Sequence, residues 1–150
     1  MRVLIQRVKK ATVIIEDEIF SEINQGLLIF VGIEAEDTQD DIDWLASKIS
    51  RLRIFSDENN AMNLSVQDVN GECLVVSQFT LHANTKKGNR PSFINAANPE
   101  IAIPIYEKFL AQLEKESDKK LKTGKFGTMM DVALINDGPV TIWIDSKKRE

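Results

Sequence analysis

Apolar and polar residues alternate along the first part of the chain, as they do in strands that bury one face. Residues 2–9 and 12–16 both have this period of two, and a short basic joint around Lys10 separates them. The pattern predicts a hairpin that turns at this joint. Residues 19–23 predict a short third strand, and the apolar run 27–33 predicts a strand that is buried on both faces.

Two later stretches have the spacing of amphipathic helices. The first begins at Asp37-Thr38, carries aspartates in its first turns and repeats apolar residues every three or four positions. The second begins at Asn98-Pro99, a cap residue followed by a proline that suits the first helical position. Pro104 lies inside this second pattern, so we expect the helix either to kink or to restart there.

The remaining pattern indicates strands at residues 72–77, 130–135 and 140–144. Between the first of these and the second helix, residues 82–91 lose the apolar period and predict a long loop. No internal repeat or linker divides the chain. The sequence therefore predicts a single α+β domain, residues 1–150, with a mostly antiparallel sheet and two main helices.

Length and charge narrow the function classes. The 150 residues carry a formal net charge of −4 and 43 % apolar residues, as in ordinary globular proteins. An acidic chain does not coat nucleic acid non-specifically, but Lys86, Lys87 and Arg90 form a local basic cluster that is either a solvated surface or a binding face. With no signal peptide and no apolar run of membrane-spanning length, we expect a cytoplasmic protein.

Several common kinds of catalytic site are missing from the sequence. His82 is the only histidine, so no metal site is expected. The glycines are scattered singly and form no phosphate cradle, so no nucleotide cofactor is expected either. Ser77 and His82 are too close in sequence to favour a hydrolase triad. Cys73 lies in an apolar run and is expected to be a buried, unreactive thiol.

Two stretches remain in which the main chain itself, and not a side chain, is the candidate functional group. In residues 136–141, Gly138 and Pro139 stand between two expected strands, which is most often a tight hairpin corner and less often a presentation of bare main chain. In residues 77–81, a strand ends in a small polar residue and enters a loop. Consecutive N–H groups at such a place can hold an oxyanion, whereas Ser77 and Thr80 can equally make local hydrogen bonds to the turn.

Four stretches together resemble one known family. They are Met1–Val8, Ser77–Leu81, Lys87–Phe93 and the segment from Lys125 to Thr141. In their order and separation they resemble the D-aminoacyl-tRNA deacylases, formerly called D-tyrosyl-tRNA deacylases, over essentially the whole chain. His82 and Asn84 depart from the pattern, since an aromatic residue such as tyrosine and an aspartate are expected at these positions.

The resemblance implies a homodimer of antiparallel, barrel-like protomers. Gly138 and Pro139 would form a cis peptide that enters the active site of the other subunit, and Arg7 would brace them. From the residues alone, Arg7 lies equally well on an exposed strand face. The pocket for the terminal aminoacyl-adenosine would be lined by Ser77, Gln78, Phe79 and Thr80.

The substrate implied by the resemblance is tRNA that carries a D-amino acid or glycine. Phe126 and Met129 would pack on the terminal adenine, unless they belong to the core, and Lys86, Lys87 and Arg90 would contact phosphates. Water would attack the ester while N–H groups around Gln78 and Phe79 hold the oxyanion and a ribose hydroxyl assists.

Three alternatives to this reaction scheme stay open. Thr80 would act as a nucleophile in the first. The second is an RNA-binding or ligand-binding dimer without hydrolysis, and the third is a general esterase that uses Ser77 and His82.

Overall fold

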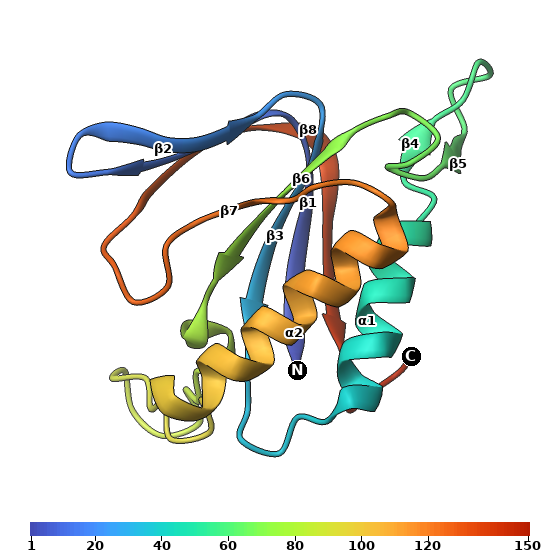
Figure 1. Ribbon diagram of the computed structural model, residues 1–150. Helices are drawn as coiled ribbons and strands as arrows, with labels where there is room; N and C mark the ends of the chain where they lie inside the picture. Colours follow the sequence, from blue (N-terminus) through green and yellow to red (C-terminus); the bar gives the residue numbers. More distant parts are fainter.

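The computed structural model describes all residues from 1 to 150, and one long strand, β1 (Arg2–Ile15), organises its sheet. β1 pairs antiparallel with β2 (Glu18–Ile23), β3 (Gly26–Gly32) and β8 (Asp131–Asp145). β3 continues in parallel to β6 (Glu72–Ser77), which pairs in parallel with β7 (Lys122–Thr123). The sheet is therefore mixed, and it curls into a nearly closed barrel (Figure 1). The predicted α+β class is confirmed.

The hairpin predicted near Lys10 is wrong. β1 runs through this position without reversing, and the chain turns only at Glu16 and Asp17, whose φ angles are 51° and 64°. Lys9 and Lys10 are exposed and lie on an uninterrupted strand. The basic joint contains no residue that favours a turn, so pairing with β8 on both sides of it keeps the strand extended.

Both predicted helices are present, and they cover the same face of the sheet (Figure 1). α1 (Gln39–Arg51) begins after Thr38, whose N–H donates to the Asp41 carboxylate at 2.8 Å. α2 (Pro99–Ser117) begins after Asn98, whose side chain accepts a hydrogen bond from the N–H of Ile101 at 3.2 Å. α2 continues through Pro104 as one helix, so the expected restart at this residue is wrong.

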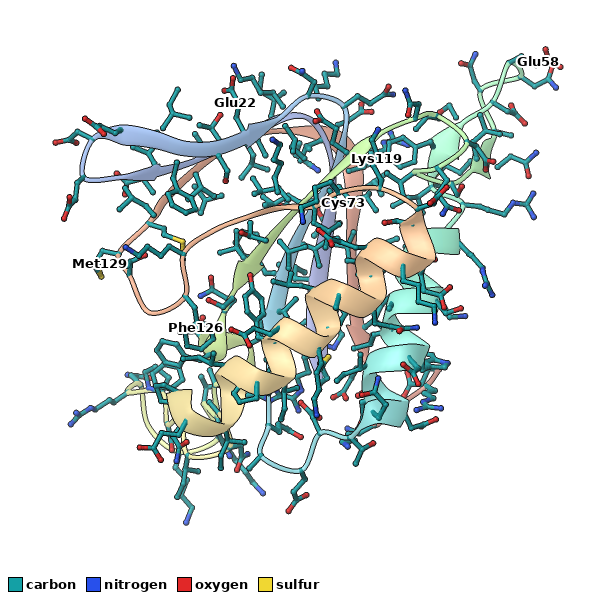
Figure 2. The ribbon with its side chains drawn as sticks, viewed as in Figure 1. Glu22, Glu58, Cys73, Lys119, Phe126 and Met129 are labelled. Carbon is teal, nitrogen blue, oxygen red and sulfur yellow. The ribbon has the colours of Figure 1, made fainter.

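The core lies mainly between the sheet and the two helices, and a second, smaller apolar cluster fills the curled part of the barrel. β3 contributes to both. Leu27 and Ile29 belong to the main core, and Leu28 points the opposite way into the smaller cluster. All three side chains are fully buried, which confirms the prediction of a strand covered on both faces. Cys73 is also buried, and burial raises the pKa of its thiol to about 12 (Figure 2).

The remaining elements are short. A small hairpin of β4 (Phe55–Ser56) and β5 (Met62–Leu64) projects from the end of α1 (Figure 1). A 3₁₀ turn, η1 (Phe79–His82), follows β6. Neither helix has the length and apolar character needed to cross a membrane.

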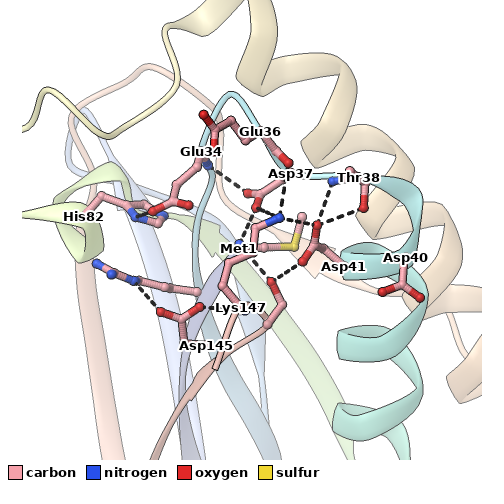
Figure 3. A network of polar contacts seen from close by, with 12 residues as sticks. Met1, Glu34, Glu36, Asp37, Thr38, Asp40, Asp41, His82, Asp145 and Lys147 are labelled. Carbon is pink, nitrogen blue, oxygen red and sulfur yellow. Dashed lines mark hydrogen bonds and ion pairs between the residues drawn. The ribbon is translucent and has the colours of Figure 1, made fainter. Parts of the chain in front are cut away.

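The two ends of the chain meet at the start of α1 in a network of polar contacts (Figure 3). Asp41 is central: its carboxylate accepts hydrogen bonds from Ser146 Oγ at 2.6 Å and from Lys147 Nζ at 2.7 Å. Burial by itself would raise the pKa of Asp41, but the hydrogen bonds from Lys147, Ser146 and Thr38 outweigh it and hold the pKa well below its usual range.

This network makes stability depend on pH with a definite sign. A carboxyl group with a lowered folded-state pKa stabilises the fold above its unfolded pKa of about 3.9, and this contribution disappears as the pH falls. We expect Asp41→Asn to lower the free energy of unfolding by about 2 kcal/mol at pH 7, because several charge-assisted hydrogen bonds are weakened. The deficit should shrink below about pH 4.

Urea unfolding at a series of pH values measures this effect. Asp43→Asn is the matched control, since Asp43 is an exposed residue of the same helix and bonds only to Gln39. A deficit for Asp41→Asn that stays constant from neutral pH into the acid range would contradict the lowered pKa.

Candidate functional site

The segment around Gly138 and Pro139 is a bulge in a continuous strand. Gln6 of β1 faces Thr141 of β8 and Val8 faces Asn136, so one residue of β1 lies opposite four residues of β8. Pairing with β1 continues in the same antiparallel direction on both sides of the bulge. The interpretation as a hairpin corner is therefore wrong. The Gly138–Pro139 peptide bond is cis, and both residues are exposed.

Arg7 is the residue of β1 opposite this bulge, and its side chain binds Asp137, the first residue of the bulge. Nε of Arg7 lies 3.0 Å from Asp137 Oδ2 and donates to the Asp137 carbonyl at 3.2 Å. The guanidinium also donates to the carbonyl of Ile54. Arg7 is only 8 % exposed, so the interpretation as a residue of an exposed strand face is wrong. Its contacts with an anion and two carbonyls offset the cost of burying the charge.

The stretch from Ser77 to Thr80 joins β6 to η1. The N–H of Gln78 donates to the Val31 carbonyl at 2.7 Å and so extends the ladder between β3 and β6 by one bond. η1 begins its own pattern with the N–H of Leu81, which donates to the Gln78 carbonyl at 3.2 Å. The N–H groups of Phe79 and Thr80 precede this bond, in the first turn, where no intrahelical acceptor exists.

The side chains of this stretch divide between local contacts and solvent. Gln78 Nε2 donates to Thr80 Oγ1, so this local hydrogen bond joins two side chains and is not the bond to the turn backbone that the sequence also allowed. Phe79 is 57 % exposed and packs edge-on against Phe93, with ring centroids 5.1 Å apart. Phe79 thus presents an aromatic face toward solvent, while the N–H groups of Phe79 and Thr80 have no acceptor within η1.

Charged side chains from the ends of β1 and β3 contact η1, and Figure 3 shows one of them, Glu34, beside His82. Arg2 donates through Nη1 to the Leu81 carbonyl at 3.1 Å and through Nε to Asp145 at 2.9 Å. His82 is buried, and its Nδ1 lies 2.9 Å from Glu34 Oε1 without the alignment of a hydrogen bond. A side chain enclosed in this way is badly placed to act as a base for Ser77. The sequence analysis overlooked Arg2, although a cation in an apolar strand is a signal that Arg2 shares with Arg7.

The two backbone-rich stretches lie far apart within one chain. Across the sheet, Ser77 aligns with Val31, and Val31 with Val3, whereas the bulge lies opposite Arg7. Val3 and Arg7 are separated along β1 by about 13 Å, at 3.3 Å per residue. The stretches also belong to β6 and β8, which have β3 and β1 between them. A single chain therefore does not bring Gly138 and Pro139 to Phe79.

Neither of two pockets of about 290 Å³ and 640 Å³ is lined by any of Ser77, Gln78, Phe79 and Thr80. The smaller lies beside Cys73 and Lys119, and the larger lies between α1 and the end of β8. No group of three or more His, Cys, Asp or Glu side chains is arranged to hold a metal ion.

The other predicted site residues lie on two loops. Phe126 is partly buried against Tyr106, with ring centroids 5.7 Å apart, whereas Met129 is 92 % exposed on the same loop between β7 and β8 (Figure 2). Of the two, only Phe126 fits the alternative of a core residue. Lys86, Lys87 and Arg90 are exposed on the loop that follows η1 and form no ion pair, so their charges are available to a partner.

Comparison with known proteins agrees with the resemblance seen in the sequence. A family model described as D-Tyr-tRNA(Tyr) deacylase matches residues 4–145. Curated D-aminoacyl-tRNA deacylases from Flavobacterium johnsoniae and Bacteroides thetaiotaomicron are 63 % and 56 % identical, each over the full length of both chains.

Solved structures agree as well. The structure titled c-Myc DNA Unwinding Element Binding Protein is 42 % identical and aligns with a TM-score of 0.90 over 97 % of this chain and 98 % of its own. A probable eukaryotic D-amino acid tRNA deacylase, 14 % identical, shares the fold with a TM-score of 0.81 over 95 % of this chain and 97 % of its own. On this identity and coverage, the chain belongs to the D-aminoacyl-tRNA deacylases, a family of hydrolases.

Proposed function

We propose that this protein hydrolyses the ester between a D-amino acid and the terminal ribose of tRNA in the cytoplasm, releasing the free amino acid and the tRNA. The observation that carries the proposal is a pair of main-chain segments whose backbone groups lie outside the regular strand and helix pattern. One is the bulge with Gly138 and Pro139, and the other is the first turn of η1 with the N–H groups of Phe79 and Thr80. Family membership supplies the substrate class.

Two copies of the chain would form the complete site. In one chain the bulge lies in the middle of β1 and β8, whereas η1 follows the end of β6, so the bulge of one copy would meet the η1 turn of another. A twofold axis makes such an exchange reciprocal, because each copy then donates its bulge and receives the partner copy's bulge. A homodimer with two identical sites follows.

Hydrolysis in this site depends on backbone donors. Water attacks the ester carbonyl, and the N–H groups of Phe79 and Thr80 stabilise the negative charge that develops on the carbonyl oxygen. The N–H of Gln78, which the sequence analysis included, already donates to Val31 and is not available. The attack forms a tetrahedral intermediate, which collapses as the bond between the carbonyl carbon and the ribose oxygen breaks. The ribose oxygen leaves with a proton from the attacking water, and the amino acid is released as a carboxylate. His82, the only histidine, is buried beside Glu34 and is badly placed to act as a base. The neighbouring ribose hydroxyl of the tRNA therefore positions the water.

Selection of the D isomer would depend on shape. Main chain at Gly138 and Pro139, held against the α-carbon of the substrate, leaves no volume for an L side chain, while a D side chain points away. A site that excludes by size does not reject a smaller group, so glycyl-tRNA also enters. Phe126 and Met129 would contact the terminal adenine, and Lys86, Lys87 and Arg90 would bind phosphates of the acceptor end.

The test of the function is ester loss from three substrates. We expect rapid deacylation of D-aminoacyl-tRNA and glycyl-tRNA, and L-aminoacyl-tRNA that stays intact on the same time scale. Cleavage of all three at similar rates would contradict the steric gate, and cleavage of simple esters alone would favour a general esterase. Tight binding of tRNA without ester loss would instead identify a binding protein.

Thr80→Val separates the water mechanism from covalent catalysis. Valine keeps the shape and the backbone N–H but removes the hydroxyl that accepts from Gln78. Loss of one side-chain hydrogen bond is worth about 1 kcal/mol, so we expect kcat to fall by less than about tenfold. The rate of deacylation under single-turnover conditions, compared between Thr80→Val and the wild type, measures this change. If kcat vanishes in a folded Thr80→Val protein, Thr80 is the nucleophile and the backbone mechanism is wrong.

A further inference from the structure

We infer that Asn136 is a positioning residue for the Gly138–Pro139 segment, because its side-chain amide replaces hydrogen bonds that the bulge removes from the sheet. Its effect on substrate selection rests on the proposed function. The hydrogen bonds of Asn136 do not depend on the proposed function, so they can be tested separately.

The bulge leaves carbonyl groups without a strand partner. Arg7 has no opposite residue on β8, although its neighbours Gln6 and Val8 do. The Asn136 amide donates to the Arg7 carbonyl at 3.0 Å and to the Val140 carbonyl at 3.1 Å. Since a backbone carbonyl in a sheet requires a donor, these two bonds let β8 leave the ladder and return to it.

The same amide closes the neck of the bulge. Asn136 is the last paired residue before the bulge and Val140 is the last residue of the bulge, before pairing resumes at Thr141, and the bond between them ties the two ends together. Within this closed loop, a Cβ on Gly138 would lie 3.2 Å from Asn136 Oδ1, so the side chain also packs beneath the exposed glycine. Arg7 holds Asp137 from the other side. The exposed main chain is thus fixed at both ends of its short loop.

The position of the main chain at Gly138 and Pro139 must be fixed, because a steric gate excludes a side chain only if the gate does not move. Main chain that can recede by a fraction of an ångström admits a side chain that rigid main chain excludes. Loss of the Asn136 donors should therefore raise the cleavage of L-aminoacyl esters relative to D-aminoacyl esters. Glycyl esters have no side chain to exclude, so their cleavage relative to the D ester should not change. A residue that only supports folding would lower all three rates in proportion.

Asn136→Asp is the sharpest substitution, since a carboxylate has nearly the same shape and donates no hydrogen bond at neutral pH. We expect the ratio of kcat/KM for D over L esters to fall by at least about tenfold, with the glycyl-to-D ratio unchanged. Asn59→Asp is the matched control, because Asn59 is exposed on the β4–β5 loop and uses only its backbone N–H there. This control should keep the wild-type ratios.

Two further measurements keep the test decisive. Asn136→Ser retains one donor, so it should give an intermediate D-to-L ratio even if the aspartate variant folds poorly. Hydrogen exchange of the peptide that covers residues 136–142 should be faster in Asn136→Asp than in the wild type or in Asn59→Asp, and this readout needs no activity. Wild-type protein that leaves D esters intact would overturn the proposed function alone, while exchange would still report on the clamp. Unchanged D-to-L ratios in both Asn136 variants of an active enzyme would overturn the inference.

Discussion

The site depends on one constraint, which is that a backbone group without a strand partner must find another donor or acceptor. β8 departs from β1 for four residues, and such a departure normally ends a strand. Here side chains supply what the ladder lacks: Asn136 donates to two carbonyls, and Arg7 donates to the carbonyl of Asp137. Exposed main chain is therefore presented from within a sheet, with the rigidity of a sheet.

The η1 turn, which follows the end of β6, obeys the same constraint. Arg2 donates to the Leu81 carbonyl, and Gln78 extends the sheet through its N–H bond to Val31. Close packing adds to these bonds. A Cβ on Gly32 would lie 2.9 Å from the His82 ring and 3.0 Å from the Gln78 carbonyl, so only glycine lets η1 approach β3. Both segments of the proposed site are thus main chain held by side chains.

Periodicity along the sequence predicted the elements whose burial is local, such as β3 and the two helices. It could not predict the turn at Glu16 and Asp17, because neither residue type marks a positive φ as glycine does. The parallel pairing of β3 with β6 joins segments that are distant in sequence. Gly138-Pro139 reads as a hairpin corner locally, and only pairing with β1 on both sides makes it a bulge. The Gln78 N–H likewise looked available until its partner on β3 was known.

The surface around the bulge bears on why the proposed site would be shared between two copies. Ile135 precedes the bulge and Trp143 follows it, and they are 57 % and 48 % exposed. Phe79, in the η1 turn after β6, is also 57 % exposed. Single exposed apolar residues are common, but these three flank the two segments that the proposed reaction would bring together. Covering them in a twofold contact would shield the ester from bulk solvent, apart from the attacking water, at the same step that positions the gate. Association and selectivity would then have a single structural cause.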